Sequence, residues 1–107
     1  MTASQIRQAA QCASLDELRT EIDRLDRLLV KLLSERQRYI ERAAEIKSHR
    51  RSVRDEARIA DVLEKVLAEA RSAGLDPEIA GPVFRTLVEC SIALELRAFD
   101  SRRRDSS

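Results

Sequence analysis

Apolar and polar positions repeat with a helical period over the first half of the chain. Between Ser14 and Lys47 the apolar residues recur at steps of three and four, which keeps one face of a helix apolar. They are Leu15, Leu18, Ile22, Leu25, Leu29, Leu32, Leu33, Ile40, Ala43 and Ile46. Ser14 and Glu17 have the spacing of a capping box, in which each side chain accepts from the other's backbone N–H. The pattern predicts one amphipathic helix over residues 14–47.

This helix is longer than the rest of the chain can cover. About 34 residues at about 1.5 Å each give a length of about 50 Å. A compact monomer of 107 residues is only about 30 Å across. Because a long exposed apolar face is typical of an interface, we expect a second copy of the chain to cover it, as a homodimer.

A second helix is expected after a polar, basic connection at residues 48–52. Ser52 and Asp55 offer a second start resembling a capping box. The residues that follow carry one apolar face, made by Ile59, Val62, Leu63, Val66, Leu67 and Ala70. Gly74 can adopt the left-handed conformation that ends a helix, and Leu75 can add a hydrophobic contact there. We therefore predict the end of this helix at Gly74.

A third helix is expected from Pro77 to about Phe99. Asp76 is suited to its N-cap and Pro77 to its first position. Its apolar positions are Ile79, Val83, Phe84, Leu87, Val88, Ile92, Leu96 and Phe99. Pro82 cannot donate a backbone hydrogen bond to the carbonyl of Glu78, so the pair Gly81-Pro82 should kink or delay this helix.

The composition supports an all-α fold. The chain holds two glycines, two prolines and few β-branched residues, among many Ala, Leu, Glu and Arg. A length of 107 residues allows one domain with a modest core. We expect a flexible N-terminal lead-in at residues 1–13, a helical domain at 14–99 and a disordered charged tail at 100–107.

Charge and cysteine content exclude several classes of function. The formal net charge is +1, so no overall field draws in nucleic acid or a membrane, and any anion site must be local. Arg50, Arg51 and Arg54 form a small basic cluster that resembles a solvated turn. Two distant cysteines and a single histidine predict reduced thiols and no metal site. The sequence holds no signal peptide or membrane span, so a cytoplasmic protein is expected.

Charged and polar residues interrupt the apolar faces of the first and third helices. Arg19, Arg36 and Lys47 lie on or beside the stripe of the first helix, and steps of three and four on the third lead to Ser91 and Glu95. Long cationic side chains can extend to solvent, and Glu95 can pair with one of them. Burying several charged groups without a ligand is costly, however, so we favour an anion-binding site.

This pattern resembles the all-helical chorismate mutases. The resemblance covers about residues 14–99, through LRTEIDRLDRLLVKLLSERQRYIERAAEIK, VRDEARI, GLD and LVECSIALE. It implies three helices per subunit in an intertwined homodimer with shared active sites. It also implies a small dicarboxylate substrate, chorismate, which a [3,3] rearrangement converts to prephenate without a metal or other cofactor.

The resemblance assigns a role to each of the five interrupting residues. Arg19 reaches into the partner's site, and Arg36 clamps a substrate carboxylate. Lys47 contacts a carboxylate and the ether oxygen. Ser91 lies near the second carboxylate, and Glu95 hydrogen-bonds the ether oxygen. Because an ionised carboxylate repels that oxygen, we expect Glu95 to act in its protonated form, with activity rising toward mildly acidic pH.

The chain departs from the family pattern near the start of the second helix. Ile59 stands where much of the family has a Glu that binds the C4 hydroxyl of chorismate, while Asp55 can still contribute its backbone N–H. This departure leaves isochorismate-pyruvate lyase and 4-amino-4-deoxychorismate mutase open as alternatives. A non-catalytic helical dimerisation module, with its buried arginines setting the register of the helices, is a further alternative.

Overall fold

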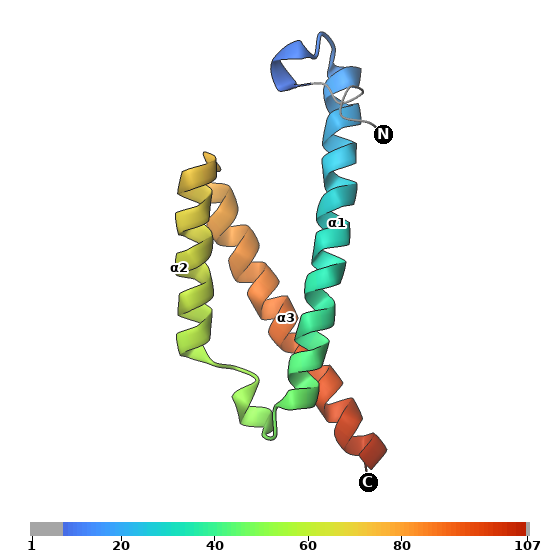
Figure 1. Ribbon diagram of the computed structural model, residues 1–107, viewed down its shortest axis with the longest axis vertical. Helices are drawn as coiled ribbons and strands as arrows, with labels where there is room; N and C mark the ends of the chain where they lie inside the picture. Colours follow the sequence, from blue (N-terminus) through green and yellow to red (C-terminus); the bar gives the residue numbers. More distant parts are fainter. Residues whose placement is uncertain (1–7, 107) are drawn as a thin grey trace. The chain divides into compact units, whose positions relative to one another are not determined.

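The computed structural model describes residues 8–106, and these residues form helices, turns and short connections without any strand. In chain order the elements are the 3-10 helix η2 (Ala9–Gln11), α1 (Leu15–Ile46), the 3-10 helix η3 (Arg50–Ser52), α2 (Glu56–Ala73) and α3 (Pro77–Ser106) (Figure 1). This confirms an all-α fold with three long helices, the first of which has 32 residues.

The chain divides into two units, and the first ends at Arg36. Within it, helix α1 starts where the capping box predicts. The hydroxyl of Ser14 accepts from the backbone N–H of Glu17 at 3.1 Å, as expected. The Glu17 carboxylate accepts from the backbone N–H of Ala13 at 2.6 Å, one residue before the expected donor. Both bonds satisfy donors that a helix start leaves open.

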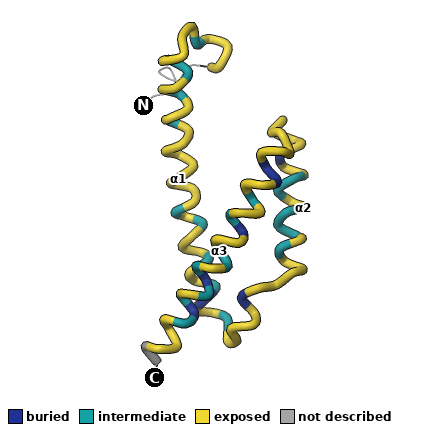
Figure 2. The backbone as a smooth tube through the Cα atoms, turned by 180° about the vertical axis from the view of Figure 1, so that it is seen from behind, coloured by how far each residue is buried: buried dark blue, intermediate teal, exposed yellow. Residues whose placement is uncertain are grey.

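The apolar face of this first unit is exposed. Residues 8–36 contain no second long helix to cover it, and Figure 2 shows this part of α1 mostly in the colour of exposed residues. The exposed large apolar side chains here are Leu15, Ile22, Leu25, Leu28, Leu29, Val30, Leu32 and Leu33. An apolar face of this length is available to a partner.

The second unit, from Gln37 onward, has a small core between helices α2 and α3 and around the end of α1. Helices α2 and α3 pack against each other, and η3 packs on α3 (Figure 1). The buried apolar residues are Ala44, Val53, Ala70, Ala80, Val88 and Phe99. Most of these side chains are small, so this core supplies a limited hydrophobic free energy.

Helix α2 begins later than the sequence predicts. Its N-cap is Asp55, whose Oδ1 accepts from the backbone N–H of Arg58 at 3.1 Å, and its first residue is Glu56. Ser52 instead ends the 3-10 turn, with its own N–H donating to the carbonyl of His49. The expected start at Ser52 is therefore wrong. The carboxylate of Asp55 caps the helix one turn later.

The turn between α2 and α3 matches the sequence prediction. Gly74 has a φ of 76°, in the left-handed region that favours glycine. The N–H groups of Gly74 and Leu75 donate to carbonyls of the last turn of α2 at 3.3 and 2.8 Å. On the other side, the Asp76 carboxylate accepts from the N–H of Glu78 at 2.9 Å and caps α3, which begins at Pro77.

Helix α3 is longer than the sequence predicts. It starts at Pro77 and continues through Pro82, so this proline does not delay it. It also continues past Phe99 to Ser106, whereas a disordered tail was expected at residues 100–107. The expected boundary at residue 99 is therefore wrong for residues 100–106. Of the expected lead-in, residues 9–11 form η2, and residues 1–7 lie outside the described part.

Long-range hydrogen bonds explain this extension. Nη1 of Arg102 donates to the carbonyl of Ala44 at 2.5 Å, and Nη2 of Arg103 donates to the carbonyl of Ser48 at 3.0 Å. The Ala44 carbonyl lies in the last turn of α1, and Ser48 follows the end of that helix, where backbone acceptors lack partners and the helix dipole is negative. The last turns of α3 therefore supply hydrogen-bond donors to carbonyls at and just after the end of α1. These bonds offset the entropic cost of ordering residues 100–106.

Candidate active site

An ion pair between Lys47 and Glu95 is the centre of the candidate site. Lys47 follows the last residue of α1, and Glu95 lies in the middle of α3. The Lys47 Nζ is 2.7 Å from Oε2 of Glu95. Only 4% of Glu95 is exposed, whereas the Lys47 side chain is 29% exposed. The structure thus brings together two residues that the sequence assigns to the reaction.

Glu95 retains unused hydrogen-bonding capacity despite this short contact. Nζ of Lys47 is not aligned as a hydrogen-bond donor to Oε2, and its hydrogen bond goes to the carbonyl of Val53 at 3.4 Å. Among the buried side-chain atoms within residues 8–106, Oε2 of Glu95 lacks a hydrogen-bond partner. The lysine compensates the charge of Glu95. It leaves Oε2 able to form a hydrogen bond with a ligand.

Ser91 shares the helix face of Glu95. The two residues are four apart on α3, a spacing that places side chains one above the other. Ser91 is half-buried, and its Oγ donates to the carbonyl of Leu87 at 2.7 Å. This bond directs the hydroxyl toward the preceding turn of α3.

Asp55 and Ile59 lie at the start of α2. Asp55 is the N-cap, so its carboxylate already accepts a backbone hydrogen bond from within the helix. Ile59 lies one turn later, and its side chain is half-buried. The two positions are four apart in the chain, so they share one side of the helix. At position 59 this side presents an apolar group instead of a carboxylate.

Arg19 and Arg36 belong to the first unit and are placed by their own helix. Arg19 is exposed, and Arg36 is half-buried. Seventeen residues at about 100° each leave them about 100° apart around the axis of α1. They therefore face in different directions. Their assignment to one site with Lys47 stays an expectation from the resemblance.

A cavity of about 220 Å³ lies at the end of α1 in the second unit. Its lining residues are Glu45, Ile46, Lys47, Ser48, Phe99, Arg102 and Arg103. Of the residues that the sequence assigns to the site, only Lys47 lines it. The pair of Lys47 and Glu95, with Ser91 on the same face of α3, is therefore the better candidate for the reaction.

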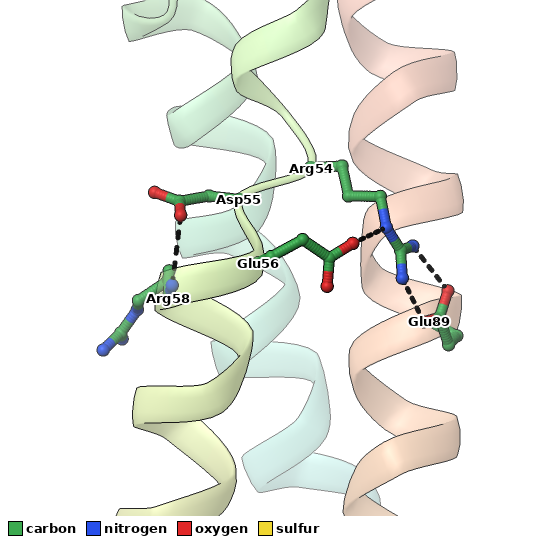
Figure 3. Close-up of polar contacts among 5 residues, drawn as sticks. All are labelled: Arg54, Asp55, Glu56, Arg58 and Glu89. Carbon is green, nitrogen blue, oxygen red and sulfur yellow. Dashed lines mark hydrogen bonds and ion pairs between the residues drawn. The ribbon is translucent and has the colours of Figure 1, made fainter.

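The basic cluster after α1 is not simply solvated. Arg54 pairs with Glu89 of α3 at 2.9 and 3.0 Å and with Glu56 at 2.7 Å (Figure 3). Arg50 pairs with Asp100 of α3 at 3.0 Å. Hydrogen bonds from Arg54 lower the pKa of the Glu89 carboxyl below its ordinary value. The sequence offers opposite charges at these positions, but their separation of 35 and 50 residues gives no periodic signal that pairs them.

Metal sites and membrane-spanning helices are both absent from residues 8–106. No group of three or more His, Cys, Asp or Glu side chains is placed to hold a metal ion. No helix in the same range has the length and apolar character needed to cross a bilayer.

Comparison with known families identifies the family of the chain. Comparison with curated proteins finds no match. The profile of the family described as "Chorismate mutase type II" matches residues 18–96, which are 79 of the 107 residues. The matched stretch contains every residue that the sequence assigns to the site, from Arg19 to Glu95. The chain therefore belongs to the chorismate mutase type II family.

Proposed function

We propose that this protein is a chorismate mutase that converts chorismate to prephenate. The observation that carries the proposal is the pair of Lys47 and buried Glu95, joined across two helices of a chain in this family. A buried carboxylate beside a lysine is costly for a merely structural core. It suits a site that must handle a dianion with a reactive ether oxygen.

The reaction needs positioning and charge stabilisation. One ether C–O bond breaks and one C–C bond forms within the same molecule, so no group leaves and no nucleophile is required. Catalysis follows from holding the reacting carbons together and stabilising negative charge on the ether oxygen. The planar fork of Arg36 suits a carboxylate, and Arg19 suits the same task from a partner subunit. The compact ammonium of Lys47 suits a carboxylate and the ether oxygen.

Glu95 has to donate a hydrogen bond to that oxygen. Without a ligand its carboxylate lies 2.7 Å from the Lys47 ammonium. A substrate carboxylate competes for the same ammonium, and Glu95 then needs a proton to avoid a buried, uncompensated charge. We infer that substrate binding takes up one proton at Glu95, which makes turnover faster toward acidic pH.

The proposal includes a homodimer. The exposed apolar face of residues 15–33 and the small side chains of the core support it. Sedimentation velocity should give a mass close to twice 12.2 kDa at micromolar concentration. A monomer under these conditions would contradict a site shared between subunits.

The direct test is turnover of chorismate by the purified protein. Prephenate formation is measured for the wild type and for Lys47→Ala and Arg36→Ala. We expect a measurable wild-type rate and a loss of about 10²-fold or more in each variant, the scale reported for removing one charge-stabilising donor. A wild-type rate no higher than the uncatalysed reaction, with the dimer intact, refutes the proposal.

Ile59 favours isochorismate-pyruvate lyase as the second candidate. Isochorismate carries its hydroxyl at C2, so it does not need a carboxylate at position 59 to bind a C4 hydroxyl. Incubation with isochorismate, followed by assays for salicylate and pyruvate, separates the two activities. If chorismate is the substrate, Ile59→Glu should lower its KM by supplying a hydrogen-bond acceptor for the C4 hydroxyl.

A further inference from the structure

The connection between α1 and α2, residues 47–55, is tied to helix α3 by charged side chains. The ties are spread along α3, and all of them lie within the second unit. They are Arg103 Nη2 to the Ser48 carbonyl at 3.0 Å, Arg50 Nε to Asp100 Oδ1 at 3.0 Å, and Arg54 Nη2 and Nη1 to the two oxygens of Glu89 at 2.9 and 3.0 Å. The connection therefore runs along α3 in the opposite direction.

The direction of the Lys47 side chain depends on this connection. A lysine side chain has a flexible four-carbon stem, so its partners decide where the ammonium points. Its ion-pair partner is Glu95 on α3, and its hydrogen-bond acceptor is the carbonyl of Val53 at 3.4 Å. Val53 is 4% exposed and directly precedes Arg54 in the chain. A displacement of Arg54 therefore displaces the carbonyl that holds Lys47.

Arg54 has two kinds of partner with different consequences. Figure 3 shows its guanidinium between the carboxylates of Glu56 and Glu89. The bond to Glu56 is local, because the two residues are two apart in the chain. The two parallel bonds to Glu89 join the connection to α3, and this bidentate geometry fixes a direction as well as a distance.

We propose that Arg54 and Glu89 are positioning residues of the active site, whose ion pair sets the Val53 carbonyl and thereby the direction of the Lys47 ammonium. This role rests on the proposed function, since it assigns Lys47 to the reaction. Neither residue needs to touch the substrate. Their contribution is to place the ammonium against the bond that breaks, where small displacements reduce the rate strongly.

The experiment compares variants that differ in which bond of Arg54 they remove. Arg54→Ala and Glu89→Ala remove the bonds to α3, and Glu56→Gln weakens only the local bond by removing its charge. Arg54→Lys keeps the charge and loses the bidentate geometry. Each is assayed for kcat and KM with chorismate. Since the tie is an exposed ion pair, we expect kcat to fall about fivefold in the first two variants, with KM changing less than twofold.

A second readout follows Lys47 itself without any substrate. The chain holds three lysines, Lys31, Lys47 and Lys65, so ¹³C-lysine labelling gives three Cε signals. We expect the Lys47 signal to shift in Arg54→Ala and in Glu89→Ala, and the Lys65 signal to stay. Glu56→Gln should leave both the Lys47 signal and kcat unchanged. Arg54→Lys should give an intermediate kcat.

The outcomes separate the two proposals. If Arg54→Ala and Glu89→Ala each lower kcat, and the double variant lowers it no further, the pair acts as one unit, as proposed. If kcat stays at the wild-type value, or the Lys47 signal does not shift, Arg54 and Glu89 do not position Lys47. A different outcome is that the wild type is inactive on chorismate while the Lys47 signal shifts in Arg54→Ala and Glu89→Ala. In that case the proposed function is wrong, but Arg54 and Glu89 do position Lys47.

Discussion

Replacing Lys47 with methionine removes the cation next to Glu95 and keeps an unbranched side chain of similar length. The structure then leaves a carboxylate that is 4% exposed without its compensating charge. Breaking a buried ion pair in this way is far more costly than removing both partners, because the remaining charge stays desolvated. Lys47→Met should therefore destabilise the protein even though methionine packs well.

The magnitude follows from how deeply each partner is buried. Loss of one partner of a fully buried pair costs about 3–5 kcal/mol. The Lys47 side chain is 29% exposed, so water screens part of this interaction and the loss reduces to about 2–3 kcal/mol. In a domain of this size this corresponds to a fall of about 10–20 °C in Tm.

Urea denaturation followed by circular dichroism measures this loss. Wild type and variants are compared at one protein concentration, because dimerisation makes apparent stability depend on it. The control is Lys65→Met, which removes an exposed lysine paired with Asp61 and should leave the urea midpoint unchanged. Lys47→Met/Glu95→Leu should recover most of the lost stability, because no charge then remains buried.

The double variant gives the refuting result. If Lys47→Met is as stable as the wild type at pH 7, or if Lys47→Met/Glu95→Leu is no more stable than Lys47→Met, Lys47 does not compensate a buried carboxylate.

Three further predictions concern single side chains. Glu95→Gln should flatten the rise of kcat toward acidic pH, since glutamine donates at every pH; a wild-type kcat that increases with pH contradicts the proton on Glu95. The pKa of the Glu89 carboxyl lies below its ordinary 4.5 because Arg54 donates hydrogen bonds to it. The stability that this ion pair contributes is therefore complete above pH 4.5. It is lost as the pH falls through the lowered pKa that Glu89 has in the folded protein. Glu89→Gln should therefore lose stability less steeply than the wild type in urea titrations below pH 4.5, and an equal slope would mean that the pair is absent. Gly74→Ala should cost about 1 kcal/mol from its positive φ, with open space around its Cβ, whereas Gly81→Ala in helix α3 should be neutral or stabilising by thermal unfolding.

Local signals in the sequence predicted the helix boundaries that depend on neighbouring residues. Ser14, Gly74 and Asp76 act through hydrogen bonds to residues within five positions, so the pattern around them contains the information. The sequence does not decide whether Ser52 or Asp55 caps α2, because both residue types cap helices and both precede an apolar face. Only the backbone path through η3 decides that Asp55 is the cap.

Contacts between distant segments could not be predicted in the same way. The apolar stripes placed Lys47 and Glu95 on core-facing sides of two helices, and the structure confirms that these two side chains meet. The partners of Arg54 and Arg102 lie 35 and 58 residues away, where periodicity carries no information. For the same reason no local pattern predicts that residues 100–106 continue helix α3.

The hydrogen bonds from Arg102 and Arg103 join the last turns of α3 to the end of α1 and the residues just after it. The family profile ends at residue 96, before either arginine, although Arg102 donates to a carbonyl of the first helix and Arg103 to a carbonyl just after it. A chain trimmed to the matched region would keep every residue assigned to the reaction and lose these two donors. In this protein the residues that stabilise the helical domain therefore extend beyond residues 18–96, the region that matches the family.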